Sequence, residues 1–243
     1  MVRGSGLISR KGGGLMRVET IRCFDREFLS ITGEAGNLED PEAEADALFL
    51  QFTQVLEAYG LSLENTIRSR IWAADGEART ACSEARSRTL KGLARAATSS
   101  YIAPAHLTKG GRVAMDLIAI CPSGNKAKVV IEQKPPQGVI KWLTVGELLV
   151  LPGMSCNDGG SFESQAEDIL GRITTCLANA GSRWSDVVEI TFVCQSGIQQ
   201  QDIFLAFHKE TKEVPLRMVL LPAEGYSRPG KFLEIEVMAI KLS

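Results

Sequence analysis

Polar and apolar side chains alternate along several short runs of the chain, which is the pattern of half-buried β-strands. The clearest run is 233–240, where Glu234 and Glu236 alternate with apolar residues, and the run 112–120 repeats the pattern around Asp116. Both runs end in Ala-Ile, at an offset of 120 residues. A copy at this distance indicates an internal repeat.

Other landmarks recur in the same order and at nearly the same offset. They are a hairpin segment ending in Gly33 or Gly153, a helical segment ending in Gly60 or Gly181, and strand-like runs at 66–72 and 187–193. We therefore interpret the chain as a tandem duplication of a unit of about 110 residues, a normal size for one hydrophobic core.

The pattern predicts an α+β fold in which each unit follows the order β-β-α-β-α-β-β. Two helices would cover one face of a mostly antiparallel sheet. The expected organisation is a flexible N-terminus at 1–16, a first unit at 17–121, a linker with one short strand at 122–139, and a second unit at 140–243.

Local signals place the helices and one turn. The first helix should begin at Asp40-Pro41-Glu42, an N-cap acid followed by proline, and run to Tyr59 before Gly60. A second helix is expected at 78–97. In the second unit, the predicted elements are a hairpin at 142–151 with a Gly146-Glu147 turn, a helix that starts near Ser161 to Ser164, where a capping box fits 164–167, and a helix at 201–209.

Composition excludes several classes of protein. The chain is 44% hydrophobic and 23% charged, as expected of a soluble globular protein, and its net charge of -2 argues against nucleic-acid or membrane binding. Six cysteines without a CxxC pair indicate reduced thiols in the cytoplasm, and two histidines argue against a His-rich metal site. No apolar run approaches the ~20 residues that cross a bilayer.

Both units resemble the Rid family of reactive-intermediate (enamine and imine) deaminases, also called endoribonuclease L-PSP-like. The resemblance covers residues 17–121 and 140–243. It rests on the hairpin glycine, the helix ending in glycine, Pro215-Leu216-Arg217 and the closing run 233–240. It implies a chorismate mutase-like fold and assembly into trimers, with sites in clefts between neighbouring units.

The resemblance also implies a catalytic site in the second unit. Arg217 would bind a substrate carboxylate through two parallel hydrogen bonds, and Glu236 would orient or deprotonate a water that attacks a C=N carbon and releases ammonia. Main-chain groups near Gly153 and Val219 would hold the substrate or the water. Tyr226 lies in a lengthened loop beside this site and is a further candidate for substrate binding. No metal or organic cofactor is required.

The sequence also departs from the family pattern. In the first unit the arginine position falls near Ser99, and Asp116 replaces the second glutamate. Pro152-Gly153-Met154 replaces the family's Ser-Gly-Gln, and neither the family's asparagine nor its hairpin tyrosine has a clear counterpart. We therefore expect a catalytically silent first unit and a partly retained site in the second.

Three functions stay open at this point. The leading one is a deaminase or related hydrolase of a small carboxylate-bearing substrate, resembling 2-iminobutanoate/2-iminopropanoate deaminases. The others are a divergent enzyme of specialised metabolism, catalysing a dehydration, cyclisation or other hydrolysis, and a non-catalytic ligand-binding or assembly module. Arg217 has its own alternative, a structural ion pair with an acid on a neighbouring strand. A trimer of tandem chains is the favoured assembly, with a monomer as the alternative.

Overall fold

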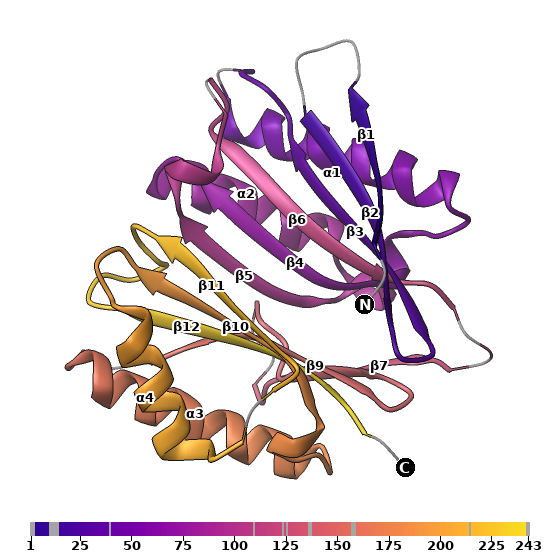
Figure 1. The fold of residues 1–243 in the computed structure, drawn as a ribbon. Coiled ribbons are helices and arrows are strands. Elements are labelled where there is room, and N and C mark those ends of the chain that lie inside the picture. Colours follow the sequence, from indigo (N-terminus) through magenta and orange to yellow (C-terminus); the bar gives the residue numbers. More distant parts are fainter. Residues whose placement is uncertain are drawn as a thin grey trace. The chain divides into compact units, whose positions relative to one another are not determined.

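The computed structural model describes residues 3–9, 15–38, 40–108, 110–122, 124, 126–135, 138–156, 159–213 and 215–241, the first of these ranges as backbone alone. The chain divides into two compact units after Lys128. Each unit is one six-stranded sheet with two α-helices on one face (Figure 1).

In the first unit the strands have the spatial order β1-β2-β3-β6-β4-β5. Neighbouring strands are antiparallel except for the parallel pair β4 and β5. The elements are β1 (Arg3–Ser9), β2 (Leu15–Cys23), β3 (Arg26–Glu34), α1 (Pro41–Ala58), η1 (Leu63–Asn65), β4 (Thr66–Ala73), α2 (Gly76–Thr89), η2 (Gly92–Ala94), β5 (Ala97–Ile102), η3 (Pro104–His106) and β6 (Val113–Ile120).

In the second unit the order, read from the corresponding edge, is β7-β8-β9-β12-β10-β11. The parallel pair is β10 and β11. The elements are β7 (Lys128–Ile131), β8 (Trp142–Val145), β9 (Leu148–Ser155), α3 (Phe162–Asn179), η4 (Trp184–Asp186), β10 (Val187–Gln195), α4 (Gln200–Thr211), β11 (Arg217–Ala223) and β12 (Leu233–Ile240).

The two sheets have the same topology, and the expected β-β-α-β-α-β-β order is present in both. Each unit also begins with one additional strand, β1 or β7, at the same edge of its sheet. The start at 1–16, expected to be flexible, therefore contains a strand paired with β2, while residues 1, 2 and 10–14 lie outside the described residues. The short strand expected at 122–139 is β7, an edge strand of the second sheet.

The helix ends follow local chemistry. The Asp40 side chain accepts a hydrogen bond from the Glu42 N–H, which caps α1 as expected. Gly60 and Gly181 have φ of 70° and 68°, the left-handed conformation that favours glycine just beyond a helix.

The start of α3 lies in the expected stretch 161–164, although Ser161 and not Ser164 is its N-cap. Two other local predictions were wrong. Helix α2 ends at Thr89 instead of 97, since the chain turns at Gly92, which has a φ of 58°, and enters β5. Tyr59, expected on the same inner face of the first helix as Leu48 and Phe52, is 51% exposed and does not pack in the core.

Each unit has its own hydrophobic core between its helices and its sheet. Leu48 and Phe52 of α1 pack there with Ile31, Ile71 and Leu117 of the first sheet, all nearly or fully buried. The matching core of the second unit includes Ile169, Ile173, Phe192, Phe207 and Val237. Burial of one such side chain contributes about 1.5–3 kcal/mol to folding, so these faces fix which way each strand presents its other side chains.

A buried polar residue in the first helix of each unit binds the chain just before or at the start of the last strand. In the first unit, Glu44 accepts hydrogen bonds from the N–H groups of Arg112 and Val113, each at 2.9 Å. In the second unit, Gln165 accepts one from the Phe232 N–H at 2.9 Å and donates to the Gly230 carbonyl at 2.7 Å. This shared contact is a further landmark of the duplication.

Candidate functional site

The predicted catalytic residues lie on the face of the second sheet that points away from its helices. On β12, Ile235 and Val237 belong to the core on the helix side. Side chains alternate between the two faces along a strand, so Glu234 and Glu236 point to the opposite, helix-free face. Both carboxylates are nevertheless buried, with 7% and 1% of their surface exposed.

Strand pairing brings three of the five predicted site residues into one row. Val219 on β11 pairs with Thr191 on β10, and Thr191 pairs with Glu236 on β12. The register between β12 and β9 shifts at this point, so that Pro152 and Gly153 together face the single residue Glu236. A bulge of this kind re-aims side chains and recurs beside active sites.

Arg217 lies in the next row of the sheet, two residues from Val219. It pairs with Glu189 of β10, and its Nη1 donates a hydrogen bond to Glu189 Oε2 at 2.8 Å. The structural ion pair considered from the sequence is therefore formed. The Arg217 side chain keeps 36% exposure, and its Nε and Nη2 make no hydrogen bond or ion pair with the residues that the structure describes. These two donors are the ones that a substrate carboxylate would use.

Thr191 is a candidate site residue that sequence reasoning missed. It is 1% exposed, and its Oγ1 has no hydrogen-bond partner among the described residues. An unsatisfied buried hydroxyl costs about 1–3 kcal/mol, so a ligand or water that completes it would be favoured. In the sequence Thr191 reads as an ordinary β-branched strand residue, and only its pairing with Glu236 identifies it.

Tyr226 is engaged inside the second unit. Its hydroxyl lies 3.0 Å from the Val193 carbonyl and 3.1 Å from the Phe232 carbonyl, and the residue is 6% exposed. Burial raises the pKa of the phenol well above its usual range. These contacts fix the loop of Tyr226 against β10 and the start of β12, and the substrate contact suggested by the sequence stays a prediction.

The corresponding row of the first unit is occupied by side chains that bind one another. Asp116 accepts hydrogen bonds from Thr32 Oγ1 and from Trp72 Nε1, each at 2.8 Å, and lies 3.8 Å from Arg70 Nη1. Ser99 pairs with Arg70 in the same row. An acid with three such partners serves the structure of the sheet, in keeping with the silent first unit expected from the sequence.

Strand register also corrects the alignment of the two units at the position of Arg217. Arg217 pairs with Glu189, and the matching residue of β4, Arg68, pairs with Ala97. The position of Arg217 in the first unit is therefore Ala97, two residues before the expected Ser99. Ser99 instead corresponds to Val219. The first unit still lacks an arginine at this position.

Other chemistry is limited in the described part of the chain. No group of three or more His, Cys, Asp and Glu residues there is arranged to hold a metal ion. All six cysteines lie in the described ranges, and none of them forms a disulfide. His106 stacks on the ring of Trp72, with the centroids 4.2 Å apart. Among the helices that the structure describes, none is long and apolar enough to cross a membrane.

Comparison with known proteins identifies the fold. No protein-family model and no curated protein sequence matches the chain. A crystal structure of a chorismatase matches it over 96% of this chain and 78% of the chorismatase, with 15% identity and a TM-score of 0.65. The chain has the chorismatase fold.

Structures of single Rid-type proteins match about half of the chain. One is a member of the YjgF/YER057c/UK114 family from Mycobacterium tuberculosis, which covers 47% of this chain and 100% of its own, with 19% identity and a TM-score of 0.43. Another is RidA from an Antarctic Psychrobacter, covering 42% and 87%, with 18% identity and a TM-score of 0.39. The α+β fold of two tandem Rid-like units, expected from the sequence, is confirmed by the likeness to the chorismatase together with the repeated topology.

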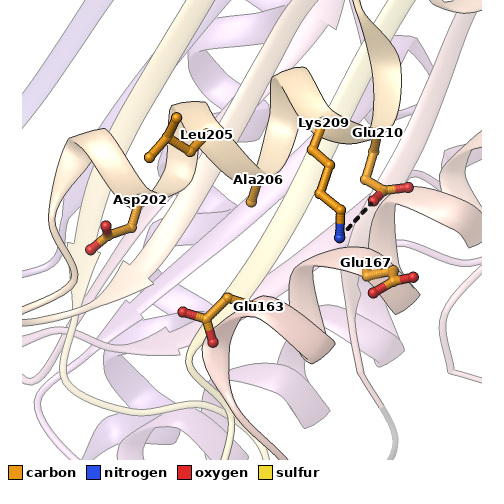
Figure 2. A pocket seen from close by; sticks show the side chains of 7 residues that line it. All are labelled: Glu163, Glu167, Asp202, Leu205, Ala206, Lys209 and Glu210. Carbon is orange, nitrogen blue, oxygen red and sulfur yellow. Dashed lines mark ion pairs between the residues drawn. The ribbon is translucent and has the colours of Figure 1, made fainter.

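Within this chorismatase fold, a separate cavity of about 210 Å³ lies between α3 and α4 (Figure 2). Four carboxylates line it, and the one lysine there, Lys209, pairs with Glu210 at 3.9 Å. The other lining residues are Glu163, Glu167, Asp202, Leu205 and Ala206. The cavity is on the helix side of the unit, away from the face that carries Glu236. A group of surface acids alone does not define a ligand, and we assign no function to it.

Proposed function

We propose that the chain is a hydrolase of a small carboxylate-bearing molecule, with its site on the helix-free face of the second sheet. The observation that carries this proposal is the row of Val219, Thr191 and Glu236 beside the Gly153 bulge, with Arg217 in the adjacent row. It combines a carboxylate, an unsatisfied hydroxyl and a guanidinium on one face. The fold shared with a chorismatase supports a hydrolytic role.

Arg217 is the proposed anchor for the substrate. Glu189 fixes one end of its guanidinium, which leaves Nε and Nη2 as a pair of parallel donors. This fork matches the two oxygens of a carboxylate. The hydrogen bond to Glu189 positions the guanidinium of Arg217. The negative charge of Glu189 also competes with the substrate carboxylate for the positive charge of this guanidinium.

Glu236 is the proposed base. Its carboxylate would take a proton from a water molecule as that water attacks the substrate carbon. Thr191 Oγ1, directly across the strand pair, would hold the water or a substrate oxygen. Because β11 is the outer strand of its sheet, half of its main-chain groups lie outside the ladder, and those near Val219 are available to a ligand.

Two kinds of substrate fit this chemistry. The Rid resemblance favours a 2-imino acid, which would release ammonia. The likeness to a chorismatase over nearly the whole chain favours a different hydrolysis, such as that of chorismate. The absent Ser-Gly-Gln segment, replaced by Pro152-Gly153-Met154, also favours a substrate other than the usual imines. A shared carboxylate anchor makes Arg217 essential in either case.

The test compares the wild type with Arg217→Ala and Glu236→Gln on both substrates. One assay measures ammonia from 2-imino acids made in situ from serine or threonine by a dehydratase, and the other measures loss of chorismate by chromatography. Glu224→Gln, an exposed acid of the same unit, is the control. The proposal requires that the wild type accelerate one reaction and that both site variants lose at least about a hundredfold of it. Binding of substrate with no turnover would instead support a non-catalytic module.

We propose that tandem chains form a trimer, on the Rid resemblance, and that the protein is cytoplasmic, because none of its six cysteines forms a disulfide. A monomer mass by light scattering would contradict the first, and fractionation of cells the second.

A further inference from the structure

A lysine and two serines meet where β9 ends and β12 begins. Lys231 Nζ donates a hydrogen bond to Ser155 Oγ at 2.6 Å and another to Ser227 Oγ at 3.2 Å. Ser155 is the last residue of β9 and pairs with Glu234. Neither Ser155 nor Lys231 belongs to the site proposed for Glu236, whose row is one step further along the sheet.

The lysine is held by hydroxyl groups and not by an ion pair. Among the described residues, no carboxylate lies within ion-pair distance of its Nζ, and the side chain is half-buried. Burial lowers the pKa of Lys231. The charges of Glu234 on β12 and of Cys156 after β9 raise this pKa and so oppose the effect of burial. The charges of Arg228 in the loop and of Arg172 on α3 lower it further. Such surroundings favour a neutral amine, which is the form that can act as a base.

The backbone of Ser155 is held in place by its neighbours. Its main-chain carbonyl accepts a hydrogen bond from Arg172 Nη2 at 2.6 Å, and its strand is paired with β12. Ser155 is also partly exposed. A serine whose hydroxyl is within hydrogen-bond reach of a basic side chain is the usual signature of an activated nucleophile, and Ser–Lys pairs are an established form of it.

We propose that Ser155 is a nucleophile activated by Lys231, and that the two form an acyl-transfer site for small carboxylic esters. Ser155 Oγ attacks the ester carbonyl while the neutral Lys231 amine takes the hydroxyl proton. The C–O bond to the alcohol then breaks, and the lysine ammonium gives its proton to the leaving oxygen. Water attacks the resulting acyl-serine with Lys231 again as the base, which releases the acid and restores Ser155.

This inference does not rest on the hydrolysis proposed for Glu236 and Arg217. Its test has a different readout, covalent labelling of one serine. A fluorophosphonate forms a P–O bond with an activated serine and loses fluoride, and the labelled peptide is located by tandem mass spectrometry. The full chain is used, at pH values from neutral to alkaline, with circular dichroism to check that each variant folds.

The wild type should be labelled at Ser155, and Ser155→Ala should not be labelled. Lys231→Arg keeps the positive charge and cannot act as the base, so labelling should slow by at least about a hundredfold. Two controls match these changes in the same unit and should label as the wild type does. They are Ser164→Ala, whose hydroxyl donates to the Ser161 carbonyl, and Lys209→Arg on α4.

The labelling rate of the wild type should rise with pH as the Lys231 amine loses its proton, and the rise should be absent from Lys231→Arg. Turnover of 4-nitrophenyl acetate should follow the same profile and disappear in Ser155→Ala. No labelling of the folded wild type at any pH would overturn the proposal. Labelling that persists in Lys231→Arg at the wild-type rate, or that falls on another serine, would overturn it equally.

Discussion

Arg217 and Glu189 lie directly opposite each other on the parallel strands β11 and β10, and a hydrogen bond of 2.8 Å joins their side chains. Glu189 is 8% exposed at its side chain, whereas Arg217 is 36% exposed. The acid is therefore the fixed partner, and the arginine is the one that can meet a ligand. A structural ion pair and a carboxylate anchor are thus compatible functions of the same guanidinium.

The pair predicts an effect of Glu189→Gln on substrate binding. Glutamine keeps an oxygen that can accept from Arg217 but removes the negative charge that competes with the substrate. We expect KM for the carboxylate substrate to fall several-fold with kcat nearly unchanged, measured by steady-state kinetics beside the Glu224→Gln control. An equal loss in kcat would show that Glu189 takes part in the reaction itself.

Removal of the Glu44 carboxylate should have a large effect on stability. The residue is fully buried and accepts hydrogen bonds from two main-chain N–H groups at the start of β6. Glu44→Ala leaves both N–H groups unsatisfied, so the free energy of unfolding should fall by about 2–3 kcal/mol in urea titrations. Glu57→Ala, at an exposed position of the same helix, should change it by no more than about 0.5 kcal/mol.

Tyr226→Phe separates a structural role from substrate binding. Loss of the hydroxyl leaves the Val193 and Phe232 carbonyls without this donor and should lower stability by about 1–2 kcal/mol. KM and kcat should stay within about twofold of the wild type, because the hydroxyl is engaged by the main chain. A large rise in KM without loss of stability would return Tyr226 to the substrate site.

Lys128 predicts a dependence of stability on pH. Burial lowers the pKa of Lys128 from 10.5 to about 8, against a smaller opposing effect of Glu64. Between about pH 8 and 10.5 the unfolded chain therefore binds a proton that the folded chain does not, and stability rises with pH in this window. Compared with Lys128→Met, the wild type should gain stability across this window and show no further change above it. A parallel pH profile for the two proteins would contradict the lowered pKa.

Elements governed by local periodicity were predictable from the sequence. The Gly146-Glu147 turn, the Asp40 cap and the placement of Glu234 and Glu236 on one face of their strand follow from side-chain alternation and turn chemistry. Gly33, which the repeat marks as the end of the first hairpin segment, lies at a close approach, because a Cβ there would lie 3.0 Å from side-chain atoms of Leu48, Met16 and Phe52.

Features that depend on distant partners were not predictable. Thr191 becomes a candidate only through its pairing with Glu236, and Ser155 through a lysine 76 residues away. The additional strand β1 has little sequence pattern of its own and is recognised by the sheet edge that it extends, whereas β7 was expected as a short strand and only its place in the second sheet was not. The second helix was predicted too long for a simpler reason. Helix-forming residues continue past Gly92, where the left-handed conformation of the glycine turns the chain.

The proposed roles of Arg217, which anchors a substrate carboxylate, and of Glu236, which directs its hydrolysis, can be tested in one experiment. It measures turnover of 2-imino acids and of chorismate by the wild type, Arg217→Ala and Glu236→Gln, all checked for folding. We predict that the wild type accelerates one reaction, that Arg217→Ala loses it mainly through KM, and that Glu236→Gln loses it through kcat. Equal turnover by all three proteins, or none by the folded wild type on either substrate, would contradict the account.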